Sequence, residues 1–140
     1  MVRKFSCILP LLILSVCVFS CREGVEDKLV GAWKGSDQLF ARSSGPNLVA
    51  TIDGGLSRQL KTTLKLNRDR TYQKLVGEYD SKSGSWELAE NELILVDELG
   101  KTVLYKLLKV TNDELIISNE VTMDTPDGEI KGTIRLSYTR

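Results

Sequence analysis

The chain has 140 residues, with 19 basic and 19 acidic side chains and no histidine. This length favours one domain with a substantial core. The balanced charge argues against a nucleic-acid-binding surface, and the missing histidine excludes Ser-His-Asp catalysis and histidine zinc sites. The cysteines are Cys7, Cys17 and Cys21, all ahead of the region predicted to fold, so we expect no enzyme, no metal site and no cofactor.

Residues 1–20 predict a secretory signal peptide. Two basic residues, Arg3 and Lys4, precede an apolar run over residues 7–19. The run falls within the roughly 7–15 apolar residues of a signal peptide and below the about 18 that a membrane-spanning helix needs. A buried cytosolic strand would need only about four to eight residues and would leave the basic flank unexplained. We therefore expect residues 1–20 to be absent from the mature protein.

The apolar run ends in the stretch "VFSC", residues 18–21, which resembles the lipobox of bacterial lipoproteins. Val18, Ser20 and Cys21 fit the branched, small and cysteine positions of that motif, whereas Phe19 is larger than the residue usual at its position. The resemblance implies that Cys21 is lipidated on its thiol and becomes the acylated N-terminus. Cleavage after Ser20 by an ordinary signal peptidase is the alternative.

Residues 21–27 are expected to form a polar tether, since the stretch "REGVED" carries four charges in six residues and has no reason to be buried. The lipobox implies a protein of the bacterial cell envelope, anchored to a membrane by lipid on Cys21. Several acyl chains matter here, because a single chain of myristoyl length holds a membrane only marginally. The acidic segment resembles the export tethers of some surface lipoproteins, which favours the outer membrane or the cell surface over the inner membrane.

From Lys28 to Arg140 the sequence predicts a domain of β-strands separated by short polar turns. Residues alternate between two types along 60–67 and 130–139, which is typical of half-buried strands. In both stretches we expect the even-numbered residues to share one face. The predicted strands occupy residues 29–41, 59–66, 71–79, 85–88, 92–97, 102–110, 114–123 and 129–139.

Short sequential strands with no long helical pattern predict an all-β antiparallel meander. About eight such strands can close into an up-and-down barrel whose interior holds side chains or one small ligand, and closure removes exposed strand edges. A sandwich of the same strands is the alternative. Residues 42–58 are too many for a tight turn. They could form a lid over the barrel mouth, an added edge strand or a plain connection.

The stretch "LVGAWKGS" holds Gly31 and Trp33, which match the Gly-x-Trp at the start of the first lipocalin strand. Together with "LKLNRDRTYQ", "GSWELAENELIL" and "YKLLKVTNDELIIS", it resembles the small lipocalin-like domains of bacterial lipoproteins over residues 28–140. The resemblance implies that Trp33 plugs the closed end of the barrel and that a basic residue packs over its ring, worth about 0.5–2 kcal/mol. Arg135 and Arg140 are the candidates, and Arg135 is preferred because it lies within the predicted strand.

Four aromatic residues are candidates for lining a ligand cavity: Tyr72, Tyr79, Trp86 and Tyr105. Barrels that bind sugars or apolar molecules use aromatic linings, although ordinary cores contain such residues too. No calcium loop is predicted around "TMDTPDGE", which lacks the ligand spacing of known loops and has the chemistry of a turn. No pattern brings two carboxylates together for glycoside hydrolysis.

Two functions remain open on these residues. The first is a non-enzymatic, membrane-tethered, lipocalin-like protein that binds a small apolar or amphipathic ligand outside the cytoplasm. The second is an interaction or structural module with a filled barrel, which docks to an envelope protein. Packing of the inward-facing residues decides between them, because a barrel without a cavity cannot hold a ligand inside.

Overall fold

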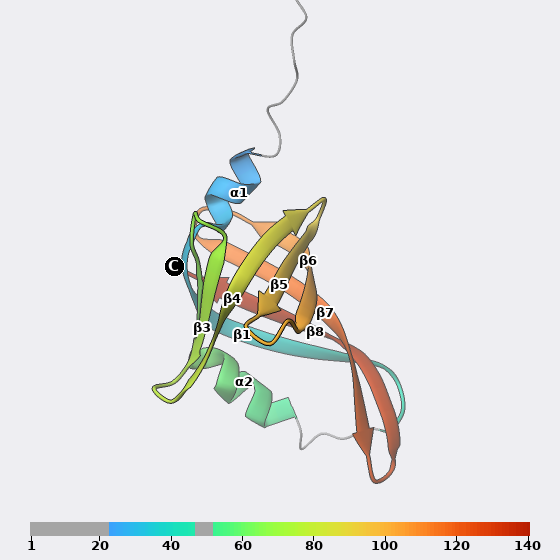
Figure 1. Ribbon diagram of the computed structural model, residues 1–140. Helices are drawn as coiled ribbons and strands as arrows, with labels where there is room; N and C mark the ends of the chain where they lie inside the picture. Colours follow the sequence, from blue (N-terminus) through green and yellow to red (C-terminus); the bar gives the residue numbers. More distant parts are fainter. Residues whose placement is uncertain (1–22, 47–51) are drawn as a thin grey trace, which may run out of the picture.

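The chain folds into a closed β-barrel (Figure 1). The computed structural model describes residues 23–46 and 52–140. Each strand pairs antiparallel with the next one along the chain, and β8 returns to β1, so the predicted all-β up-and-down barrel of eight strands is confirmed. The strands are β1 (Gly31–Ser44), β2 (Thr62–Leu66), β3 (Thr71–Val76), β4 (Asp80–Ala89), β5 (Glu92–Asp97), β6 (Thr102–Val110), β7 (Glu114–Thr125) and β8 (Gly128–Thr139).

The connection between β1 and β2 contains a helix, α2 (Ile52–Leu60). Gln59 and Leu60, predicted as the start of a strand, are the last residues of this helix, so that boundary was wrong. The helix ends there because the Thr62 hydroxyl donates to the main-chain carbonyl of Arg58 at 2.9 Å, which satisfies one of the carbonyls left open at a helix C-terminus. The strand β2 then begins with its first residue already buried.

The turn predicted at residues 80–84 was also wrong, because these residues belong to β4. The chain instead turns earlier, at residues 77–79, between β3 and β4. Gly77 has a φ of 64°, in the left-handed region that glycine adopts without steric cost. The glycine thus places the turn ahead of the polar run that looked like one in the sequence.

A short helix, α1 (Glu23–Leu29), precedes the barrel and covers one end of it (Figure 1). Residues 23–27, which we expected in a polar tether, form most of this helix. Leu29 is fully buried and Val25 packs against the core, so the domain begins earlier than the expected boundary. Cys21 and the expected signal peptide lie outside the described residues. In the part of the chain that the structure describes, no helix is both long and apolar enough to cross a bilayer.

The interior of the barrel is packed with apolar side chains. The even-numbered residues of β2 and β8 face it, as predicted from their alternation. Each fully buried leucine or isoleucine contributes about 1.5–3 kcal/mol relative to an exposed one, so the core is the main source of stability. The core cluster consists of Leu29, Trp33, Leu64, Leu66, Tyr72, Trp86, Leu93, Leu95, Tyr105, Leu107, Leu115, Ile117, Leu136 and Tyr138.

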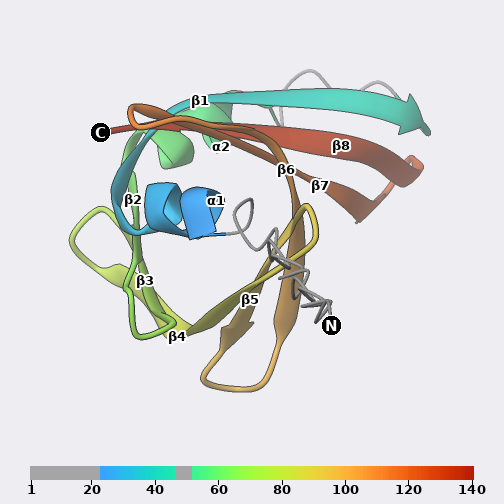
Figure 2. The same cartoon turned by 90° about the horizontal axis from the view of Figure 1, so that it is seen from above.

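The strands β1, β7 and β8 continue past the barrel as a three-stranded ribbon (Figure 2). The pairing of β7 with β8 runs along its full length, Glu114–Thr125, but its pairing with β6 covers only Leu115–Ser118. An irregular step in register between Leu107 and Lys109 accompanies this short ladder. Beyond it the two strands separate, and the β6-facing edge of residues 119–125 has no ladder partner among the described strands.

Candidate functional site

Trp33 closes the end of the barrel that carries α1. Its side chain is fully buried, and its Nε1 donates a hydrogen bond to the main-chain carbonyl of Leu29 at 2.8 Å. The guanidinium carbon of Arg140 lies 4.0 Å from the ring centroid. The stacking arginine is therefore Arg140, and the preference for Arg135 was wrong. Arg135 alternates with the inward-facing Leu136 and lies exposed on the outer face of β8.

Main-chain carbonyls hold Arg140 in place over the indole. Its guanidinium donates to the carbonyl oxygens of Lys28 at 2.6 Å, Val30 at 2.8 Å and Asn112 at 2.5 Å. Gly31 leaves the space for this arrangement, because a Cβ there would lie 2.4 Å from the guanidinium Nη1. Its φ of 139° is also one that other residues rarely adopt. The glycine of the Gly-x-Trp motif is thus favoured mainly by its backbone conformation, and it also leaves room for the arginine that packs over the tryptophan.

Trp86 is held in a similar way, by contacts made within the protein. Its Nε1 donates to the main-chain carbonyl of Asn67 at 2.8 Å, and the guanidinium carbon of Arg70 lies 4.5 Å from its ring centroid. Arg70 in turn pairs with Glu26 of α1 at 2.7 Å. These contacts connect Trp86 to α1 and account for its burial without a ligand, although it was a candidate for lining a cavity.

A pocket of about 190 Å³ lies on the interior side of the barrel wall beside α2. Figure 1 shows α2 at the end of the barrel away from α1, and we call this pocket the mouth pocket. The apolar part of its wall comes from Ile134 and Leu136 of β8. The functional groups around it are mostly neutral hydrogen-bond donors and acceptors, together with two cations. These polar lining residues are Gln38, Arg58, Gln59, Thr62, Lys74, Tyr105 and Asn119.

A close backbone approach fixes α2 beside the mouth pocket. A Cβ at Gly35 of β1 would lie 1.9 Å from the main-chain oxygen of Gln59, so only glycine allows the helix to lie this close to the strand. The Gln59 amide donates to the main-chain carbonyl of Ser137 at 3.1 Å, and Arg58 forms an ion pair with Asp80. The helix is therefore tied to three strands, β1, β8 and β4.

Lys74 is a half-buried lysine on the inward face of the barrel wall at this end. In the ladder it lies opposite the fully buried Leu64 of β2 on one side and Lys82 of β4 on the other. Burial lowers its pKa below the ordinary value of 10.5, the positive charges of Arg58 and Lys82 lower it further, and Asp80 has the opposite effect. No described carboxylate lies within ion-pair distance of its ammonium group. An anion would offset these costs.

The structure brings two of the four aromatic candidates together near this pocket. Tyr105 lines the pocket, and the neighbouring Tyr72 phenol lies close enough to raise the pKa of Tyr105. Burial raises the pKa of both phenols, and the negative charges of Asp97 and Glu98 raise that of Tyr72 further. Both are therefore neutral hydrogen-bonding groups near pH 7. Tyr79 is 96% exposed in the β3–β4 turn and does not line the pocket.

Apart from Tyr105, which was a candidate for lining a cavity, the polar lining residues were not predicted from the sequence, but Lys74 had a usable signal. It stands two residues after Tyr72 in an alternating strand, so it shares the inward phase of that buried aromatic residue. Gln59 had none, because the helix that carries it was not predicted. Gln38 follows a register shift in β1, which the alternation of that strand does not reveal.

The mouth pocket therefore suits the binding of a small anionic group. A lysine ammonium and uncharged amide and phenol groups surround a space with apolar contacts on one side, and charge-assisted hydrogen bonds to an anion are among the stronger ones in proteins. Within residues 23–46 and 52–140, no group of three or more carboxylates or other common metal ligands is placed to hold a metal ion.

Comparison with known proteins adds no family to this description. No protein-family model matches the chain, and no curated protein matches its sequence. The class that the fold defines is the eight-stranded up-and-down β-barrel, whose architecture is compatible with a lipocalin-like protein.

Proposed function

We propose that this protein is a lipocalin-like binding protein, tethered to a membrane outside the cytoplasm, that holds the anionic head of a small amphipathic molecule in its mouth pocket. The binding involves no chemical conversion. The observation that carries the proposal is Lys74, which faces the interior beside Tyr105 and Gln59 and has no ion-pair partner among the described residues.

An anionic head is favoured because it would offset the cost of holding the charged ammonium group of Lys74 at the pocket. Removing an ammonium group from water is costly, and two neighbouring cations, Arg58 and Lys82, add to the cost. Arg58 has its own carboxylate partner in Asp80. A bound carboxylate, sulfonate or phosphate group would give Lys74 the missing opposite charge. A neutral ligand would leave that charge uncompensated.

The size of the pocket limits what enters it. Its volume of about 190 Å³ is below the roughly 300–1,000 Å³ typical of pockets for drug-sized ligands, and the deeper interior is filled by the core cluster. We therefore infer that a head group enters and contacts Ile134 and Leu136, while the rest of the molecule stays outside the barrel.

The proposed anchor agrees with a mouth that faces away from the membrane. The helix α1 begins at Glu23, two residues after Cys21, and a trans peptide chain spans at most about 3.6 Å per residue. Lipid on Cys21 would hold the α1 end close to the bilayer. The pocket at the α2 end would then open to the aqueous side (Figure 1).

A pair of probes that differ in charge tests the proposed ligand class. Anilinonaphthalene sulfonate is anionic, whereas N-phenylnaphthylamine has a similar aromatic body without charge. On residues 22–140, we expect saturable fluorescence enhancement with the sulfonate. In the Lys74→Met variant its affinity should fall by about tenfold or more, equivalent to about 1.4 kcal/mol, while the neutral probe shows no such difference between the two proteins.

The control is Lys65→Met, which removes the same charge from the exposed face of the neighbouring strand β2. Lys65→Met should leave sulfonate binding unchanged. Equal losses in the two lysine variants would mean that net charge alone is responsible, and absence of saturable binding to the original chain would contradict the proposal.

Membrane tethering has a separate test. Cys21→Ala should abolish labelling by a fatty-acid probe and release the protein from membranes, because the thiol that accepts the lipid is gone. Retained labelling would contradict the lipobox interpretation without affecting the pocket.

A second candidate function is a docking module with no ligand. It is favoured by the packing of the interior, where the fourteen residues of the core cluster are all at most 7% exposed. Under this alternative the mouth pocket holds only water, neither probe binds saturably, and recognition uses the outer wall of the barrel.

A further inference from the structure

The free edge of β7 presents unpaired backbone groups. Residues 119–125 are fully paired with β8 on one side, but no described strand pairs with them on the other. In such an edge strand about half of the N–H and C=O groups point away from the sheet. Exposed edges of this kind are templates for the addition of another strand.

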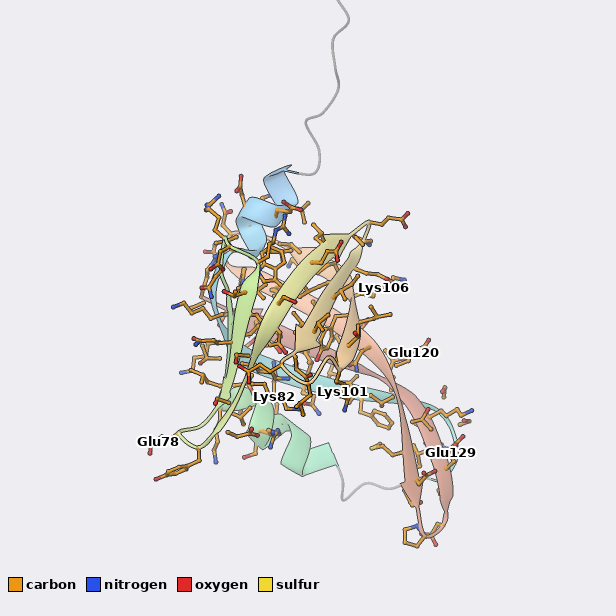
Figure 3. The ribbon with its side chains drawn as sticks, viewed as in Figure 1. Glu78, Lys82, Lys101, Lys106, Glu120 and Glu129 are labelled. Atoms are coloured by element: carbon orange, nitrogen blue, oxygen red, sulfur yellow. The ribbon has the colours of Figure 1, made fainter. Side chains whose placement is uncertain are left out.

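A groove opens where β7 separates from β6. It has a volume of about 1000 Å³, and three leucines that line it, Leu39, Leu104 and Leu108, are 48%, 52% and 49% exposed. Leucines gathered around one groove are characteristic of an interaction surface. Lys106 and Glu120 also line it, and Figure 3 shows both side chains on the same side of the molecule.

The side chains of the free edge alternate between polar residues on the outer face and mostly apolar residues on the inner face, and a partner strand would contact both rows. The even-numbered residues of the segment, including Glu120 and Asp124, are exposed on the outer face. The odd-numbered residues, including Val121 and Met123, are partly buried on the inner face. Side chains directly opposite each other on paired strands contact one another, so a partner would meet a polar, acidic row on one face and a largely apolar row on the other.

The outer row of the β7 edge itself is acidic, whereas two cations, Lys106 and Arg135, line the adjoining groove. Glu129 of β8 lies opposite Asp124 in the ladder, which places two carboxylates side by side, with Glu120 further along the same face. Lys131 pairs with Glu129 at 3.2 Å and offsets only part of this charge. Opposite charges on neighbouring strands stabilise the pairing by about 0.2–1 kcal/mol for each pair, so a basic partner is favoured.

A second copy of this chain would meet like charges in the register centred on the middle of the free edge. Two-fold antiparallel pairing of β7 with itself, centred on Thr122, would place Glu120 of each copy opposite Asp124 of the other. Like charges directly opposite each other destabilise a pair of strands. The charge pattern therefore disfavours a homodimer in this register.

We propose that the β7 edge binds an extended segment of a partner protein, which adds as a further strand and carries basic residues at alternate positions with apolar residues between them. Its basic side chains pair with Glu120 and Asp124, and its apolar side chains lie beside Val121 and Met123. This surface runs along the free edge of β7 and meets the mouth pocket only at Asn119, which lines that pocket. The proposed strand addition does not depend on the proposed ligand.

The first experiment uses three labelled seven-residue peptides with the full chain. One alternates valine and lysine, the second has glutamate in place of lysine, and the third has the valine and lysine sequence with every backbone amide methylated. We expect saturable binding of the first peptide only, because the second repels the acidic row and the third cannot donate hydrogen bonds to β7. Binding should slow hydrogen exchange of the outward-pointing amides in residues 119–125 by about tenfold or more.

The second experiment reverses the charge of the edge. The double variant Glu120→Lys with Asp124→Lys should bind the lysine peptide about tenfold or more weakly and should now bind the glutamate peptide. Glu78→Lys is the matched control, since Glu78 is exposed in the β3–β4 turn on the other side of the molecule (Figure 3). This control should leave binding of the lysine peptide unchanged.

Three outcomes would overturn the proposal. If the fully methylated peptide binds as tightly as the original, the contact is electrostatic and no strand is added. If the double variant binds the lysine peptide normally, the site is not on β7. If the original chain binds no peptide and shows no exchange protection in residues 119–125, the edge does not accept a strand of this chemistry.

Discussion

The two ends of the barrel are built from different side chains. At the α1 end, Trp33 and Trp86 are buried, each has its indole N–H bonded to a main-chain carbonyl, and Arg140 and Arg70 lie over the rings. At the α2 end, a lysine, an arginine, two glutamines, an asparagine, a threonine and a tyrosine surround the mouth pocket. Polar groups at the first end are paired within the protein, whereas Lys74 at the second has no described carboxylate partner.

This difference indicates which end is structural and which is available for binding. Burying a large aromatic side chain is favourable in itself, so the closed end needs no ligand to account for it. Partial burial of an unpaired ammonium group is unfavourable, so the anionic ligand that we propose would stabilise the mouth. Mutations at the two ends should therefore change stability in opposite directions.

The largest effect is expected for Trp33→Ala at the closed end. Removing the fully buried indole leaves a cavity and should lower the free energy of unfolding by about 3–5 kcal/mol, as measured by urea denaturation. A loss below about 1 kcal/mol would mean that Trp33 is not the plug of the barrel, which would contradict the structural interpretation of the Gly-x-Trp motif.

A smaller loss is expected for Arg140→Ala. The guanidinium stacks on Trp33 and donates to three main-chain carbonyls, and the stacking alone is worth about 0.5–2 kcal/mol. We expect a loss of about 1–3 kcal/mol in the same denaturation experiment. Arg135→Ala is the matched control and should change stability by at most about 0.5 kcal/mol, because Arg135 is exposed. A larger loss of stability for Arg135→Ala than for Arg140→Ala would instead indicate that Arg135 packs over Trp33.

Much of the fold could be predicted from the sequence because its signals are local. The alternation of residue types predicted which residues of β2 and β8 face inward, and the short polar turns predicted the order of the eight strands. The closed end was predicted in part, since Trp33 was identified and its arginine was not. Arg140 lies at the chain terminus, and only the closed barrel brings it to Gly31.

Apart from Tyr105, the residues of the mouth could not be predicted, because the pocket depends on contacts between distant parts of the chain. Gln59 reaches the pocket through a helix whose position requires Gly35, in a strand that precedes it in the sequence. The aromatic candidates also show that residue type alone does not predict where a side chain lies in the fold. Tyr72, Tyr79 and Trp86 look alike as residue types, yet one lies beside the pocket residue Tyr105, one is exposed in a turn and one is stacked at the closed end.

At the mouth, Lys74→Met should raise stability. The substitution keeps much of the length of the side chain and removes the desolvated charge, so we expect a gain of about 1 kcal/mol in the free energy of unfolding at pH 7. Loss of sulfonate-probe binding should accompany the gain. A variant that is less stable than the original chain would mean that the charge of Lys74 is not a net cost to the folded protein.

The smallest effect is the pH dependence of that gain. The folded state lowers the pKa of Lys74 below 10.5, so between the folded pKa and 10.5 the unfolded chain binds more protons. The contribution of Lys74 to the free energy of unfolding therefore rises with pH in this window. The buried phenols of Tyr72, Tyr105 and Tyr138 have raised pKa values and contribute with the opposite sign at alkaline pH.

The difference between the two proteins separates these contributions, because the tyrosines are present in both. We expect the advantage of Lys74→Met over the original chain to be constant below the folded pKa of Lys74 and to shrink as pH rises from there toward 10.5. Urea denaturation of both proteins at several pH values measures it. An advantage that stays constant through this range would show that Lys74 has the same pKa in the folded and unfolded states. The charge of Lys74 would then cost the folded protein nothing, and the main argument for an anion at the mouth would be lost.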